Sequence, residues 1–209
     1  MKHIVFGLLA FNPLLAQMQT GAQPLHIAAA PAIGASTVRI PVRSDSRLWL
    51  DGSSNVRDWT CKATAMEATI DVDKATALRS RGVRAVSVRV PVRMLKCGDR
   101  HMEANMYTAL KAPKLPDLSY ITAYFDRIPQ STAPGDLETT GQLTVAGVER
   151  TVTMTVRSER LPDGSHRARG TVPIRLTDFG IKPPRPWGGI LRTADKVLIQ
   201  FEIFIAPVK

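Results

Sequence analysis

Beyond residue 36, this chain alternates small or apolar residues with polar residues at every second position over most of its length. Leu143 and Val145, for example, share one face of an extended chain, with the polar Thr144 between them. Because successive side chains of a β-strand point to opposite faces of its sheet, this period predicts strands with one buried face. The pattern therefore restricts the chain to an architecture built mainly from antiparallel strands.

Strand-like alternation occurs in several segments that are separated by turn signals. The predicted strands are residues 37–43, 47–51, 59–72, 83–92, 120–128, 137–145, 152–156, 167–177 and 196–205. In the third of these the apolar phase changes near Met66, which predicts a β-bulge in one long, curling strand. Ala146-Gly147 and residues 162–165 have the composition of hairpin turns. Pro91 and Pro173 argue against central positions for their strands.

Residues 98–111 depart from the strand pattern. Met102, Met106 and Leu110 recur every fourth position, and Asp99 is a candidate N-cap before them. We therefore expect a helix between a first and a second group of strands, covering an end or edge of a closed or nearly closed sheet. Its methionine face fits core packing, and the alternative is a soft lining for a lipid cavity.

The N-terminus has the features of a secretory signal. An apolar run at residues 4–16 follows a single Lys, is too short to span a bilayer as a helix and is interrupted by Pro13. Cleavage after Ala16 and cleavage after Ala22 both fit the small residues nearby. We expect a signal peptide over residues 1–22, a flexible leader over 23–36 and one domain over 37–207, in a periplasmic or secreted protein of a Gram-negative type envelope.

Cys61 and Cys97 are the two cysteines, and they lie 36 positions apart. This is neither the spacing of a zinc site nor that of a redox-active pair. In an exported protein it predicts a structural disulfide, and the alternative is two buried free thiols.

The basic excess is large but scattered. The net charge is +10, and Arg79, Arg81 and Arg84 are the nearest approach to a cluster. A nucleic-acid-binding element would concentrate its cations on one short segment, so we expect no nucleic-acid partner. Arg167 and Arg169 fall on the outward face of their strand. The alternatives are a solvated surface and one attracted to an anionic membrane.

Catalytic motifs are missing. The chain has no Gly-x-Ser-x-Gly, phosphate-binding Gly-rich loop, dinucleotide fingerprint or His-Glu-x-x-His. His101 and His166 lie near no second candidate ligand in the sequence, and Asp178 and Asp195 have no partner that would make either a general base. We therefore expect a binding protein without enzymatic activity, cofactor or metal.

Several motifs resemble, in their order and spacing, those of the YceI-like family of exported bacterial proteins. They are residues 49–55 (WLDGSSN) with Asp58-Trp59, residues 102–110 followed by Pro116 and the strand 120–128, residues 141–148 (GQLTVAGV), residues 176–184 (LTDFGIKPP), and Asp195-Lys196-Val197 leading to Phe201-Glu202. The resemblance covers residues 38–207.

This resemblance implies a lipocalin-like, extended antiparallel β-barrel, here of about eight strands with one helix. It also implies an internal hydrophobic tunnel that binds a polyprenyl quinone or other isoprenoid-type amphiphile in the periplasm. It brings no catalytic motif. Apolar candidates for the cavity wall, each of which also fits ordinary core, are Val86, Val88, Leu143, Val145, Val152, Met154, Val172, Ile174, Ile199 and Phe201.

The leading hypothesis is an exported protein that sequesters or carries such an amphiphile. The alternative is an envelope stress or interaction protein that uses the barrel as a scaffold. Trp187, in the loop at residues 183–189, is its first candidate for an exposed aromatic. An interior void would favour the carrier, and a packed core with an exposed apolar patch would favour the scaffold.

Overall fold

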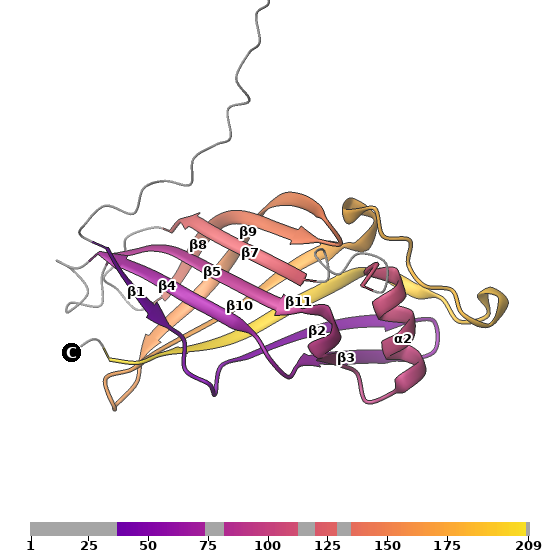
Figure 1. The fold of residues 1–209 in the computed structure, drawn as a ribbon, viewed down its shortest axis with the longest axis horizontal. Helices are drawn as coiled ribbons and strands as arrows, with labels where there is room; N and C mark the ends of the chain where they lie inside the picture. The colour runs from indigo at the N-terminus through magenta and orange to yellow at the C-terminus, as the bar shows by residue number, and fades with distance from the viewer. Residues whose placement is uncertain (1–36, 74–81, 113–119, 129–134, 208–209) are drawn as a thin grey trace, which may run out of the picture. The chain divides into compact units, whose positions relative to one another are not determined.

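The computed structural model describes residues 37–73, 82–112, 120–128 and 135–207, which belong to one compact unit. The signal peptide and leader predicted for residues 1–36 lie outside the described residues. Within these ranges the chain forms an antiparallel sheet with one α-helix (Figure 1). Its strands are β1 (Thr37–Pro41), β2 (Arg47–Ser54), β3 (Asp58–Ala63), β4 (Glu67–Asp73), β5 (Val83–Pro91), β6 (Leu95–Lys96), β7 (Tyr120–Arg127), β8 (Gly135–Val145), β9 (Val148–Arg160), β10 (His166–Arg175) and β11 (Thr193–Ile205).

The strand order is β1-β4-β5-β7-β8-β9-β10-β11-β2-β3-β6, so the sheet has eleven strands where about eight were expected. Part of the difference comes from the segment predicted as one bulged strand over residues 59–72, which forms the separate strands β3 and β4. At the break, Thr64 donates its backbone N–H to the carbonyl oxygen of Met94 at 2.8 Å. The phase change near Met66 therefore marks a passage between distant parts of the sheet.

At both edges of the curled sheet, the chain passes between strands that are far apart in the strand order. After β1 the backbone N–H of Val42 donates to Ala68 in β4, and the N–H of Arg43 donates to Phe204 in β11 at 2.9 Å. The chain then enters β2, the neighbour of β11. At the other edge, β5 leads through the 3-10 helix η1 (Val92–Met94) into β6, which pairs with β3. These passages bring distant strands together around an apolar core.

Strands β9 and β10 pair only as far as Thr155 and Thr171. Beyond that point the 3-10 helix η3 (Leu176–Phe179) packs against β9, β10 and β11 and buries Phe179, which is 2% exposed. Pro173 lies beyond the last β9 pair, in register with Leu198 of β11, so it occupies a local edge as expected of a proline.

The predicted helix is present as α2 (Arg100–Ala109). Asp99 is its N-cap, because the carboxylate accepts the backbone N–H of Met102 at 2.8 Å. Figure 1 shows α2 beside β2 and β3. Of the helices in the described ranges, none combines the length and the apolar character needed to cross a membrane.

Candidate functional site

The curled sheet and α2 enclose two apolar cavities. The outer lobe, about 210 Å³, is bounded by β2, β3, β11, α2 and the loop before β11. The inner lobe, about 170 Å³, lies between β4, β5, β7, β8, β9, β10 and β11. For scale, an apolar cavity of about 150 Å³ accepts a benzene ring. Each lobe is therefore large enough to hold part of an apolar ligand.

Two strands show that the lobes lie in line. Along β11, Thr193 and Val197 line the outer lobe, Ile199 lines both, and Phe201 and Ile205 line the inner lobe. Along β2, Ser54 and Leu50 line the outer lobe and Leu48 lines the inner lobe. Ile121 of β7 also lines both lobes. The residues that alternate inward along one strand thus form a wall that continues from one lobe to the other.

All ten candidates for the cavity wall lie on one lobe or the other. Val86, Val88, Leu143, Val152, Met154, Val172 and Phe201 line the inner lobe, Val145 and Ile174 line the outer lobe, and Ile199 lines both. Contact of these residues with a ligand stays a prediction. Met102 and Met106 of α2 also line the outer lobe, so the methionine face borders a cavity as well as packing against the core.

Trp59 is a wall residue of the outer lobe that the strand pattern alone did not single out. It stands opposite Gly52 in the β2–β3 pair. A Cβ at Gly52 would lie 2.1 Å from the Trp59 ring, so only glycine lets the indole lie against β2 there. In the sequence, this part of the wall is indicated by Gly52 together with the tryptophan of the Asp58-Trp59 motif.

Polar side chains gather at the end of the outer lobe formed by the β2–β3 turn, the start of α2 and the start of β11. They are Ser54, Arg57, Asp99, His101, Asn105 and Thr193. The pKa of Asp99 is lowered, first by the N–H of Met102 and to a smaller extent by charged neighbours that include Arg57. The inner lobe, by contrast, has only Thr139 and Ser158 as polar lining residues. The site is therefore amphiphilic, with polar side chains at one end of the outer lobe, which we call the mouth, and an apolar interior.

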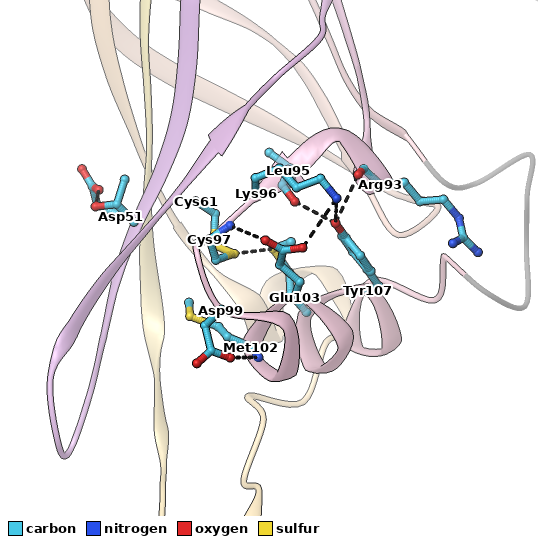
Figure 2. Close-up of a disulfide and its surroundings, with 12 residues drawn as sticks. Asp51, Cys61, Arg93, Leu95, Lys96, Cys97, Asp99, Met102, Glu103 and Tyr107 are labelled. Carbon is cyan, nitrogen blue, oxygen red and sulfur yellow. Dashed lines mark hydrogen bonds and ion pairs between the residues drawn. A yellow bond between two sulfur atoms is a disulfide. The ribbon is translucent and has the colours of Figure 1, made fainter.

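Helix α2, which covers the outer lobe, is held by a disulfide between Cys61 and Cys97, the two residues predicted to pair (Figure 2). Cys61 is fully buried and lines the outer lobe. The hydroxyl of Tyr107 lies 3.1 Å and 2.9 Å from the carbonyl oxygens of Arg93 and Leu95. The helix is thus fixed to the chain segment that forms η1 and β6.

Glu103 provides a second attachment of α2. Its carboxylate accepts the backbone N–H of Cys97 at 3.0 Å, and it lies 3.5 Å from the Lys96 ammonium (Figure 2). The hydrogen bond from Cys97, with the charge of Lys96, lowers the pKa of Glu103. The ionised carboxylate is therefore the form that holds the helix.

Glu103→Gln is expected to lower the free energy of unfolding at neutral pH. A carboxyl group whose pKa is lower in the folded state stabilises above its unfolded pKa, and this contribution is lost as the pH falls through the folded pKa. The difference between Glu103→Gln and the parent should therefore shrink in acid. Urea unfolding at a series of pH values measures it. Glu149→Gln, on an exposed part of β9, is the matched control; a difference for Glu103→Gln that is equal at all pH values would contradict the assignment.

Nowhere in residues 37–73, 82–112, 120–128 and 135–207 do three His, Cys, Asp or Glu side chains come together so as to hold a metal ion. The lining of the outer lobe is apolar, with hydrogen-bonding groups at one end.

Comparison with known proteins identifies the family. The model of the YceI-like domain matches residues 37–205. Among solved structures, BcnA of Burkholderia cenocepacia has a TM-score of 0.63 at 19% identity, covering 79% of this chain and 99% of its own. A polyisoprenoid-binding domain from Saccharophagus degradans has a TM-score of 0.59 at 12% identity, covering 81% and 98%. A Campylobacter jejuni YceI protein has a TM-score of 0.51 at 17% identity, covering 75% and 85%.

No curated protein matches the chain in sequence. At these identities the solved structures show the shared fold, whereas the family model spans nearly all of the described domain. The chain therefore belongs to the YceI-like family.

Proposed function

We propose that this protein is an exported carrier that holds one long amphiphile of the isoprenoid type in its two lobes. The observation that carries the proposal is the continuous wall along β11, from Thr193 at the polar mouth to Ile205 in the inner lobe. A chain laid along this wall would place its apolar tail in the inner lobe and its head among Arg57, Asn105 and the other mouth residues.

The energetics support this orientation. Transfer of each methylene from water to an apolar cavity contributes about 0.8 kcal/mol, so a long tail provides most of the binding free energy. A polar head in the inner lobe would have only Thr139 and Ser158 as lining partners and would lose hydrogen bonds to water. Arg57 and Asn105 offer donors at the mouth, which suits a head with carbonyl acceptors such as a polyprenyl quinone.

Two further observations agree with this proposal. One solved structure of similar fold is a polyisoprenoid-binding domain, although at 12% identity its ligand transfers to this chain only as a proposal. The Cys61–Cys97 disulfide fits an oxidising compartment such as the periplasm. We therefore retain export through a signal peptide at residues 1–22, followed by a leader at 23–36, as part of the proposal.

The scaffold alternative predicts a packed interior. The two cavities favour the carrier, since a barrel that served only as a scaffold would have no use for apolar space behind a polar mouth. We propose binding without catalysis.

Native mass spectrometry of the protein purified from its own host tests the proposal. We expect an adduct with the mass of an isoprenoid lipid that organic extraction removes, and a mature N-terminus that follows residue 16 or residue 22. The same spectrum thus reports both the ligand and the cleavage. Protein that is consistently empty and that keeps its complete N-terminus would reject an exported carrier.

A further inference from the structure

Three large apolar side chains are strongly exposed around the mouth of the outer lobe. Val56 is 67% exposed, Trp187 is 73% exposed and Ile190 is 75% exposed. The other exposed large apolar residues among those described, Val38, Met94 and Tyr124, are at 38%, 41% and 38%. The most exposed apolar surface of the described domain is therefore at one place, next to the cavity.

Hydrogen bonds bring these side chains together from two distant segments. Asn55, in the β2–β3 turn, donates its backbone N–H to the carbonyl oxygen of Arg192 at 3.1 Å and its side-chain N–H to that of Ile190 at 3.0 Å. Its side-chain oxygen accepts the backbone N–H of Arg192 at 2.8 Å. We call the joined surface, residues 54–58 and 182–192, the rim. Figure 1 shows the loop before β11 projecting at the end of the sheet where α2 lies.

The backbone around Trp187 is left-handed. Trp187 has φ 54, and Gly188 and Gly189 follow with φ 66 and 89 within the 3-10 helix η4 (Trp187–Gly189). A left-handed conformation is rare for a bulky residue and is kept only where the surrounding chain enforces it. Trp187 also lines the outer lobe, so the same side chain borders both the cavity and the exposed patch.

The rim is also basic. It contains Arg57, Lys182, Arg185 and Arg192 against a single carboxylate within its two segments, Asp58, with Asp99 of the helix cap near Arg57. None of these four cations forms an ion pair with a carboxylate in the described part of the chain. On the outer face of the sheet, some arginines, such as Arg39 and Arg157, are paired with an Asp, and others, such as Arg47 and Arg150, form no ion pair within the described ranges.

We propose that the rim docks onto the surface of an anionic phospholipid bilayer. Tryptophan and aliphatic side chains flanked by Arg and Lys are the composition of a surface that enters the headgroup layer, with the cations against lipid phosphates. The charge of the rim is complementary to such a membrane. An acidic protein surface would match the charge but would not explain three apolar residues that project into solvent around a lipid-sized cavity.

Docking deepens the proposed carrier function and rests on it, because it places the mouth of the cavity at the bilayer. Trp187 would then lie between the headgroups and the outer lobe. Because the head lies at the mouth and the tail in the inner lobe, an amphiphile would enter the cavity tail first and return to the bilayer head first. Its tail would not cross bulk water, where exposure of each methylene costs about 0.8 kcal/mol.

Flotation of the purified mature protein with vesicles tests the docking. Vesicles of equal parts phosphatidylethanolamine and phosphatidylglycerol are compared with vesicles of phosphatidylcholine alone. We expect binding to the anionic vesicles that weakens as salt shortens the screening length from about 10 Å at 0.1 M to about 3 Å at 1 M. Binding to neither kind of vesicle, or equal binding to both at all salt concentrations, would overturn the proposal.

Two variants separate docking from ligand binding. Val56→Ser/Ile190→Ser changes exposed residues that do not line either lobe, and it should reduce binding to anionic vesicles by about tenfold or more. Lys182→Gln/Arg185→Gln should remove much of the salt dependence, whereas the control Arg47→Gln/Lys62→Gln removes the same charge away from the rim and should change it less. Unchanged vesicle binding in Val56→Ser/Ile190→Ser would refute docking by the rim.

The isoprenoid content of each preparation, measured by extraction, keeps the two proposals apart. Val56→Ser/Ile190→Ser that retains bound isoprenoid but no longer floats supports docking as a separate property of the rim. A parent protein that floats on anionic vesicles but never contains an amphiphile would leave docking in place and reject the carrier.

Discussion

Ala123→Trp is expected to weaken binding of a long isoprenoid by about a thousandfold. Ala123 lies in the middle of β7, lines the inner lobe and is in register with Val88 and Leu143, which line the same lobe. An indole at this position occupies inner-lobe space that the tail would use. Exclusion of one five-carbon unit at about 0.8 kcal/mol per carbon costs about 4 kcal/mol, which corresponds to about three orders of magnitude in Kd.

The neighbouring residue provides the control. Thr122 faces the other side of β7, between Arg89 and Thr144, so Thr122→Trp adds the same bulk outside the cavity and should bind like the parent. Titration with isoprenoids of graded length measures both variants. A short isoprenoid should keep most of its affinity for Ala123→Trp, which also shows that the variant is folded. Equal affinity of Ala123→Trp and Thr122→Trp for every length would contradict the tail position.

Replacement of both cysteines, Cys61→Ala/Cys97→Ala, is expected to lower the free energy of unfolding by about 4 kcal/mol. The bridge spans 36 residues, and in the chain-entropy model closure of a loop of this length restricts the unfolded state by that amount. Alanine is preferred to serine because Cys61 is fully buried, where an unpaired hydroxyl would add its own cost. Urea unfolding compared with the oxidised parent gives the difference.

Two observations separate the bridge from the loss of side-chain volume. The parent protein unfolded in the presence of a reductant should resemble the double variant, since both lack the cross-link. Amide hydrogens of α2 should exchange faster in the variant than those of β8 and β9, because the helix would lose its covalent attachment and keep the hydrogen bonds of Glu103 and Tyr107 and the packing of its methionine face. Coincident unfolding curves for the variant and the oxidised parent would show that the bridge adds no stability.

Much of the cavity wall could be predicted because alternation along a strand determines which side chains share a face. Alternation places Leu143 and Val152 on an inward face, and both line the inner lobe. The separation of β3 from β4 could not be predicted in the same way. Alternation shows which face of a strand a residue lies on, but it does not show which other strand pairs with that strand. Strand β6 has two residues and is too short to show any period.

The mouth was missed for a different reason. Arg57 belongs to the β2–β3 turn and His101 and Asn105 to α2, so no spacing along the chain joins them. Helical periodicity placed Met102 and Met106 on one face of α2, but it could not tell whether that face would meet other side chains or empty space. The distinction depends on how far the sheet curls, which is a property of the tertiary structure.

The length of strand β11 also indicates how long a bound ligand can be. Thirteen residues at about 3.3 Å each make the strand about 40 Å long, and lining residues extend from its first position to its last. The hydrocarbon core of a bilayer is about 30 Å thick, so the acyl chains of one leaflet reach about 15 Å. A phospholipid tail would therefore stop in the outer half of the wall and leave the far half unfilled. The domain we propose as a carrier would thus discriminate against ordinary membrane lipids by tail length, without a specific contact to any headgroup.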